Sequence, residues 1–205
     1  STGVFVLCRQ FGSMSWTNLK ACPTQFIRPQ PFKIPDVDLC YYTTSYYKST
    51  QYQNAPGIYL YYVALDSHKN VKKYSFASGN YFPRSNASIY YREKHSIVCI
   101  GGCDGSRANG SFYKHLMLYN IRSQTFRKLP INETIGGNPA AVITNKHLLH
   151  IICGTANDYH ILYNLQSNNS YNIHSFEARG RREHALIYNE KTNILYMFGG
   201  CSNKI

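Results

Sequence analysis

The strongest constraint on the fold is an internal repeat. Residues 87–103 read ASIYYREKHSIVCIGGC and residues 185–201 read ALIYNEKTNILYMFGGC, and the two stretches align without a gap. A third copy, AAVITNKHLLHIICG, begins at Ala140 and reaches a glycine fourteen residues later, at Gly154. Self-similarity of this kind is typical of folds that stack several copies of one small structural unit.

Each copy predicts a strand, a tight turn and a second strand. The middle of each copy is polar, at Arg92-Glu93-Lys94, Asn145-Lys146 and Glu190-Lys191, whereas the flanks are apolar, as expected for a hairpin. The apolar columns are Ile89, Val142 and Ile187, then Val98, Ile151 and Tyr196, then Ile100, Cys153 and Phe198. Glycines follow the second strand and allow a close backbone approach there; they are Gly101, Gly102, Gly154, Gly199 and Gly200.

The segments downstream of the hairpins match as well. LMLYNIRSQTFRKL at 116–129 aligns with HILYNLQSNNSYNI at 160–173, which places Tyr119 on Tyr163. A weaker copy spans 59–74, and no stretch shows a sustained helical period. The full unit is therefore four short strands repeating every ~50 residues, which is the spacing of a β-propeller blade.

These units resemble kelch repeats, best over residues 83–205. Kelch blades carry a glycine pair after the second strand, an arginine before the first strand, and a later aromatic, leucine and proline. Matching residues are Gly101-Gly102 and Gly199-Gly200, Arg84 and Arg182, Phe126, Leu129 and Pro130, and near the start Trp16, Leu19 and Pro23. Departures are the single Gly154, the Gly137 in place of the arginine, and the lack of a glycine pair in 25–57. The resemblance implies an all-β, kelch-like propeller or a fragment of one.

The repeat boundaries divide the chain into about four blades of four-stranded antiparallel sheet. We expect the end of one blade at 1–24, a divergent blade at 25–82, blades at 83–132 and 133–177, and the start of another at 178–205, all in one propeller segment. Within the divergent blade, 32–47 is predicted as a strand pair and 48–57 as a loop. The half-blades and the first residue, Ser1, favour a piece of a longer product, although the two halves could also share one blade and close a small ring.

The charge balance bears on the partner. Lys and Arg number 22 against 10 acids, a net charge of +12, but the basic residues are spread over both ends of the predicted blades with one cluster at 179–182. Nucleic-acid binding requires a concentrated basic stripe and is therefore not expected. No apolar run reaches the 18 residues of a membrane helix, so no transmembrane segment is expected. A protein partner, acidic as one option, fits the charge.

The seven cysteines form no CxxC pair, and we interpret them as mostly buried thiols in a reducing, cytoplasmic setting. Four sequons leave a secreted protein open as the alternative; they lie at Asn86, Asn109, Asn132 and Asn168.

No catalytic residues are predicted. The sequence has no GxSxG, P-loop or HExxH motif, and the eight histidines show no ligand spacing. Neither a metal nor another cofactor is therefore expected. Galactose oxidase shares the kelch architecture and binds copper through Tyr and His, so a propeller enzyme, either an oxidase or a glycan hydrolase, remains an alternative.

The kelch resemblance implies a non-enzymatic protein-interaction scaffold that contacts its partner through loops at one end of the propeller. The partner-binding residues expected on that end are Arg84, Arg107, Lys114, Arg181 and Arg182. The long loop 103–114 is the best single contact loop. A charge-driven anion- or nucleic-acid-binding module is the third alternative.

Overall fold

The structure is a computed structural model, and it confirms the all-β class. Its described part contains strands, turns and one short 3-10 helix. In the N-terminal portion the backbone is described at 4–10, 13–19, 27–33, 39–45, 58–64 and 71–76; in the C-terminal portion the description covers 86–102, 112–120, 122–123, 125–152, 154, 159–173 and 181–202. The chain divides into two compact units, 1–79 and 80–205.

The unit 1–79 contains a two-stranded and a four-stranded antiparallel sheet. The smaller sheet pairs β1 (Val4–Gln10) with β2 (Ser13–Leu19). The larger sheet runs in chain order through β3 (Ile27–Lys33), β4 (Leu39–Ser45), β5 (Ile58–Ala64) and β6 (Val71–Phe76). The strand pair predicted within 32–47 is found only in part: β4 lies inside that range, whereas β3 begins at Ile27 and reaches the range only with its last two residues, of which Phe32 lies opposite Tyr41. The loop predicted at 48–57 lies outside the described residues.

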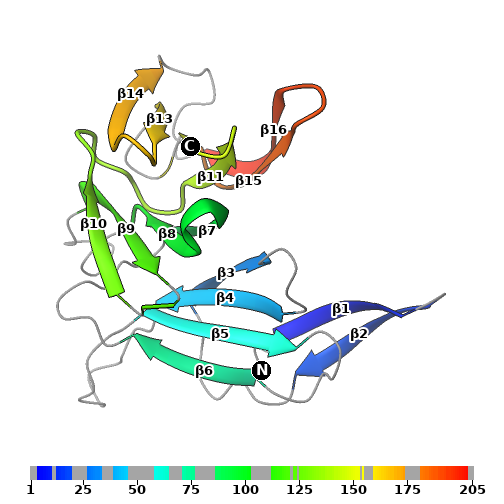
Figure 1. Cartoon of the computed structure of the whole chain (residues 1–205). Coiled ribbons are helices and arrows are strands. Elements are labelled where there is room, and N and C mark those ends of the chain that lie inside the picture. Colours follow the sequence, from blue (N-terminus) through cyan, green and yellow to red (C-terminus); the bar gives the residue numbers. More distant parts are fainter. Residues whose placement is uncertain are drawn as a thin grey trace. The chain divides into compact units, whose positions relative to one another are not determined.

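The unit 80–205 contains two four-stranded sheets and a terminal hairpin, each ordered along the chain (Figure 1). The first sheet consists of β7 (Ala87–Tyr91), β8 (Ser96–Ile100), β9 (His115–Asn120) and β10 (Thr125–Pro130). The second consists of β11 (Ala140–Thr144), β12 (Leu148–Ile152), β13 (His160–Asn164) and β14 (Asn169–Ile173). The hairpin pairs β15 (Arg181–Asn189) with β16 (Ile194–Ser202). The four-stranded sheets predicted from the repeat are thus present.

The strand register corrects the sequence alignment of the middle hairpin by one residue. The turn between β7 and β8 spans 92–95 and that between β15 and β16 spans 190–193, whereas the turn between β11 and β12 spans only 145–147. The register accordingly pairs Ala87 with Ile100, Ala140 with Ile152, and Ala185 with Phe198.

Two repeat positions change as a result. Gly154 is the counterpart of Gly102 and Gly200, not of Gly101, and Cys153 occupies the first glycine position. The column predicted to hold Ile151 instead holds His150, opposite Val142 as Val98 is opposite Ile89. The spacing between alanine and glycine was misleading. The turn 145–147 is one residue shorter than the others, but Gly154 stands one position later in the repeat than Gly101, so the spacing of fourteen residues is the same.

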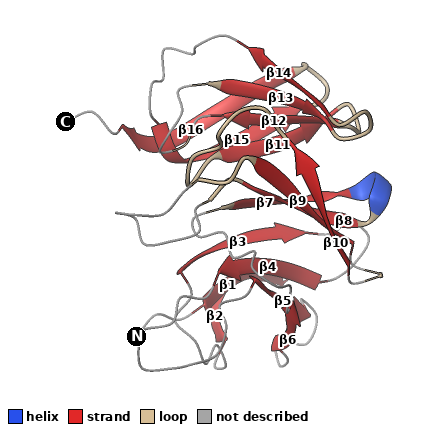
Figure 2. Ribbon diagram, turned by 90° about the vertical axis from the view of Figure 1, so that its left-hand side faces the viewer, coloured by secondary structure: helices blue, strands red, loops and turns tan. Residues whose placement is uncertain are grey.

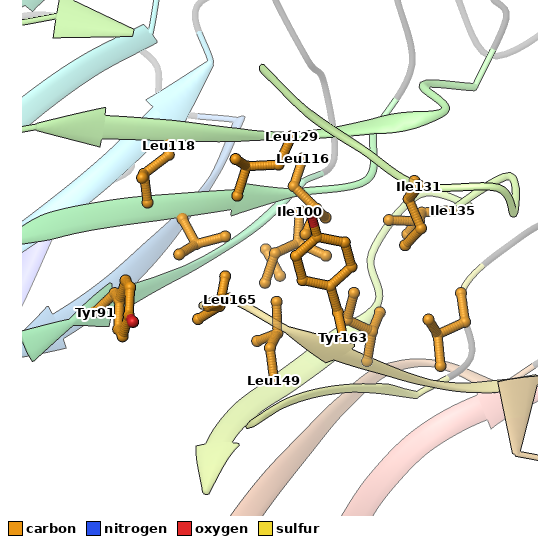
Figure 3. Packing of buried hydrophobic residues seen from close by; sticks show 14 residues of the cluster. Tyr91, Ile100, Leu116, Leu118, Leu129, Ile131, Ile135, Leu149, Tyr163 and Leu165 are labelled. Carbon is orange, nitrogen blue, oxygen red and sulfur yellow. The ribbon is translucent and has the colours of Figure 1, made fainter. Parts of the chain in front are cut away.

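The hydrophobic core lies between the two four-stranded sheets of residues 80–205. Ile100, Leu116 and Leu129 of the first sheet and Leu149 and Tyr163 of the second are all at most 2% exposed and belong to one cluster. Figure 3 shows the ring of Tyr163 directed toward Ile100 and Leu116. Alternate residues of each strand supply this face, as the period of a β-strand requires. The repeat therefore builds a core between successive sheets rather than within one.

Three turns are held by the same side-chain device. The side-chain oxygen of Asn120 accepts hydrogen bonds from the backbone N–H of Arg122 and Ser123, at 3.0 and 2.9 Å. The oxygens of Asn164 and Asn189 do the same for the residues two and three positions later. Such Asx turns satisfy backbone donors that the strands leave unpaired and so fix where each hairpin reverses.

Removing one of these turns tests their contribution. We expect Asn164→Ala to lower the free energy of unfolding by about 1 kcal/mol, because the turn N–H groups of Gln166 and Ser167 lose their acceptor. Urea unfolding followed by circular dichroism measures the change. Gln166→Ala, at an exposed position of the same turn, is the matched control. Equal destabilisation by the two variants would show that the Asn164 bonds do not support the turn.

The terminal hairpin exposes one apolar face. Ile187, Tyr196 and Phe198 are 56%, 40% and 54% exposed, and the rings of Tyr196 and Phe198 stack with centroids 6.3 Å apart. The counterparts of Tyr196 and Phe198 in the first sheet, Val98 and Ile100, are fully buried. Among the described residues, β16 pairs only with β15, whereas β8 and β12 each pair with strands on both sides. No helix in the described part of the chain is long and apolar enough to cross a membrane.

Candidate functional site

The topology of residues 80–205 gives each sheet two different ends. At one end, which we call the loop end, the odd-numbered strands begin and the even-numbered strands finish. The opposite end is called the turn end. Antiparallel order puts Lys114, Arg181 and Arg182 at the loop end, because they lie at or before the starts of β9 and β15. The short helix η1 (Arg92–Lys94) lies at the turn end, where Figure 2 draws it in blue.

A repeated backbone hydrogen bond joins successive sheets at the loop end. The N–H of Gly102 donates to the carbonyl of Gly136 at 3.3 Å, and the N–H of Gly154 donates to the carbonyl of Arg181 at 3.2 Å. Gly136 and Arg181 occupy equivalent positions, each four residues before the alanine that opens the repeat. The backbone after the second strand of each sheet is therefore hydrogen-bonded to the segment that leads into the next sheet, and these bonds connect the sheets at the loop end.

The glycines at these junctions are required by both conformation and space. Gly101 has φ +66°, and a Cβ placed there would lie 2.5 Å from the carbonyl oxygen of Gly136 and 2.7 Å from Cγ2 of Ile135. Gly154 has φ +138° and backbone atoms of Gly136 and Gly137 within 3.4 Å of such a Cβ. A Cβ would therefore clash at Gly101 and be crowded at Gly154, and the positive φ at both positions disfavours residues that carry one.

The structure places three of the five predicted partner-binding residues at the loop end. Lys114 is exposed beside the start of β9, and Arg181 and Arg182 open β15. The guanidinium of Arg181 donates to the carbonyl of Gly199 at 2.9 Å, and Nε of Arg182 donates to Sγ of Cys201 at 3.4 Å. Both arginine side chains of β15 are thus hydrogen-bonded to residues of β16, the strand paired with β15. Arg84 and Arg107, with most of the loop 103–114, lie outside the described residues.

The cysteines follow the prediction only in part. Cys99 is buried, and burial raises the pKa of its thiol to about 12. Cys201 was also interpreted as a structural thiol but is exposed beside Arg182. The terminal hairpin has no described strand beyond β16, so nothing described there covers Cys201. Cys8, Cys22, Cys40, Cys103 and Cys153 have no described side chain.

The predicted repeat tyrosines are structural. Tyr119 is 3% exposed, its ring lies 4.7 Å from that of Phe126, and burial raises its pKa to about 12. Tyr163 is fully buried in the core, and desolvation raises its pKa as well. For Trp16 only the backbone is described, in β2 opposite Leu7.

A chain of three polar side chains crosses β11, β12 and β13, and sequence reasoning missed it. The hydroxyl of Thr144 lies 2.9 Å from Nε2 of His150, and Nδ1 of His150 lies 2.9 Å from Nε2 of His160. Desolvation lowers the pKa of both histidines, and for His160 the neighbouring His150 adds to the effect and brings the pKa to about 4. Both rings are therefore neutral at pH 7.

The histidine pair is arranged to share a proton. Its ring centroids are 5.0 Å apart while the facing nitrogens are 2.9 Å apart, so the two nitrogens point at each other along one hydrogen bond. One ring must donate and the other accept. No three His, Cys, Asp or Glu side chains of the described part are grouped as metal ligands. Only the strand register brings His150 and His160 together, because in sequence they are simply ten residues apart.

Comparison with known proteins finds a similar fold but no matching sequence. No protein-family profile matches the chain, and no curated protein matches it. The chain is similar to the structure of YjhT, with a TM-score of 0.73 over 99% of this chain and 68% of the YjhT chain, at 13% sequence identity. Similarity at that level of identity concerns the fold alone.

Proposed function

We propose that the chain is a segment of a kelch-type β-propeller, in which the sheets are blades, and that it serves as a non-enzymatic scaffold for protein partners. The four-stranded sheets, their order along the chain and the core between successive sheets support the propeller assignment. The resemblance to kelch repeats supports the scaffold role. The free thiols of Cys99 and Cys201 fit the cytoplasmic location that belongs to this proposal.

The observation that carries the proposal is the repeated glycine junction at the loop end. The bonds from Gly102 and Gly154 tie one sheet to the next at the end that presents Lys114, Arg181 and Arg182. A surface held by backbone contacts loses little conformational entropy on binding. Arginine is also enriched in the energetically dominant parts of protein interfaces. The loop end is therefore the proposed contact surface, and its basic residues fit acidic side chains on a partner.

Charge reversal at the loop end tests this assignment. We expect Lys114→Glu combined with Arg182→Glu to reduce capture of the partner from lysate at least tenfold, since opposed charges in the interface become like charges. Quantitative mass spectrometry after affinity capture at high salt, with nuclease present, measures the loss. Lys146→Glu with Lys191→Glu makes the same charge change at the turn end and is the control. Equal capture by both folded double mutants would contradict the loop-end assignment.

A further inference from the structure

A second polar cluster lies at the turn end of the first sheet, away from the loop end. The hydroxyl of Tyr90 lies 3.0 Å from Nδ1 of His95, and Nε2 of His95 lies 3.5 Å from a terminal nitrogen of Arg122. Tyr90 is the penultimate residue of β7, His95 follows η1, and Arg122 lies in the turn between β9 and β10. Two turns that are neighbours in one sheet thus present one connected set of side chains.

The chemistry of these groups assigns the protons. A guanidinium has only donors, so Nε2 of His95 must accept from Arg122. The ring proton of His95 therefore resides on Nδ1 and is donated to the oxygen of Tyr90. That arrangement leaves the O–H of Tyr90 free to donate elsewhere, together with the other N–H groups of Arg122. His95 and Arg122 are exposed, so these donors face solvent.

Positive charge gathers on the same side. Desolvation raises the pKa of Tyr90, and the charges of Arg122 and Arg92 act against it, so both guanidinium groups lie within electrostatic reach of the hydroxyl. The nearby carboxylate of Glu93 acts instead on Tyr91, which follows Tyr90 on β7 and points to the opposite face of the sheet. The cluster therefore combines the guanidinium of Arg122 with a hydroxyl donor, and Arg92 adds positive charge nearby.

We propose that Tyr90 and Arg122 form a binding site for a phosphate monoester carried by a partner protein. Arginine matches the geometry of phosphate with two parallel N–H donors, and the hydroxyl adds a third donor beside them. A single phosphate group suits this site better than an extended anionic surface does, because Glu93 and Glu190 also lie in turns at this end and interrupt its positive charge. A bilayer would have to approach both carboxylates, whereas one phosphorylated side chain need not.

The repeats within the chain provide an internal comparison. Tyr188 is the counterpart of Tyr90, but its hydroxyl donates to the side-chain oxygen of Asn193 at 2.9 Å, so its proton is already used. Gln166 is the counterpart of Arg122 in the second sheet. Neither of the other repeats therefore combines a free hydroxyl donor with an arginine in the next turn. Among the described repeats of residues 80–205, the proposed site is thus found in the first one alone.

Binding of a phosphoserine peptide tests the proposal. The probe is a short Gly-Ser peptide with one phosphoserine, titrated into the full chain by NMR or fluorescence anisotropy against its unphosphorylated form. We expect only the phosphorylated form to bind, with Arg122→Gln weakening it about tenfold and Tyr90→Phe about fivefold. Arg122→Gln introduces the residue of the next repeat. Lys191→Gln removes the same charge from another turn and should change affinity less than about twofold.

Three results would overturn the proposal. The first is equal weakening by Lys191→Gln and Arg122→Gln, which would mean general charge attraction. The second is equal binding of the two peptides. The third is binding to phosphatidic acid vesicles without binding to the peptide, which would assign the site to membranes. The loop-end variant Lys114→Glu with Arg182→Glu should leave peptide affinity unchanged, so this site and the proposed scaffold function fail independently.

Discussion

Gly101→Ala is expected to lower the free energy of unfolding of residues 80–205 by about 3 kcal/mol. Part of the loss, roughly 1 to 2 kcal/mol, comes from placing a residue with a side chain at φ +66°. The rest comes from the new Cβ, which would meet the carbonyl oxygen of Gly136 at 2.5 Å and force the junction between two sheets apart. A loss of this size is a large fraction of the stability of a typical domain. Urea denaturation followed by circular dichroism measures it.

Gly199→Ala separates the two contributions. Gly199 is the repeat counterpart of Gly101 and has nearly the same φ, +67°, but nothing described lies within 4 Å of the position its Cβ would take. We therefore expect this variant to show only the conformational part. If both substitutions lower the free energy of unfolding by the same amount, the clash of the new Cβ with Gly136 does not contribute to the loss at Gly101.

Acidification is expected to destabilise the second sheet through its buried histidine pair. Burial and His150 hold the pKa of His160 at about 4, below the usual 6.5, so the unfolded chain binds more protons than the folded chain between these values. The stability this neutral pair supplies is fully present above pH 6.5 and is lost as pH falls toward 4. With a discount for partial exposure of the ring, the loss is about 2 kcal/mol. Urea unfolding midpoints measured from pH 7.5 to 4.5 give the slope.

His160→Gln identifies the group responsible. The amide nitrogen of glutamine reaches the position of Nε2 and does not titrate, so it can keep a hydrogen bond with His150. We expect the slope of stability between pH 6.5 and 4.5 to fall by at least half in this variant. The remainder would come from other histidines whose pKa is lowered by burial, among them His150, His115 and His184. An unchanged slope would remove His160 from the explanation.

Local signals were enough to predict the hairpins and the order of the strands. Polar turns flanked by alternating apolar residues marked β7–β8 and β15–β16, and the Tyr-Asn pairs marked β9–β10 and β13–β14. The Asx turns explain why those Tyr-Asn pairs align so well, since the asparagine fixes the turn chemically. Where the role of a residue depends only on its neighbours in the sequence, the structure predicted from the sequence is the one observed.

Features that depend on register were not predictable from the sequence. One residue fewer in the turn 145–147 moved His150 into an apolar column and paired it with His160. A shift of one residue changes the face on which every side chain of a strand lies. The phosphate site depended in the same way on the juxtaposition of two turns, which brought Arg122 to His95. Exposure of Cys201 was not predicted, although the start of a blade expected at 178–205 is consistent with the two-stranded form of the last sheet.

The chain-order arrangement of strands has a consequence for synthesis on the ribosome. Every described strand pairs with a strand next to it in the sequence, so each sheet can form as soon as its own residues have emerged. The apolar face of the first sheet of residues 80–205, however, packs against the second sheet, and Gly102 finds its carbonyl partner in the segment leading into that second sheet. The first of these two sheets can therefore form before translation of the second has supplied the residues that cover it. Pauses in elongation would prolong exposure of apolar strands and increase the time available for aggregation.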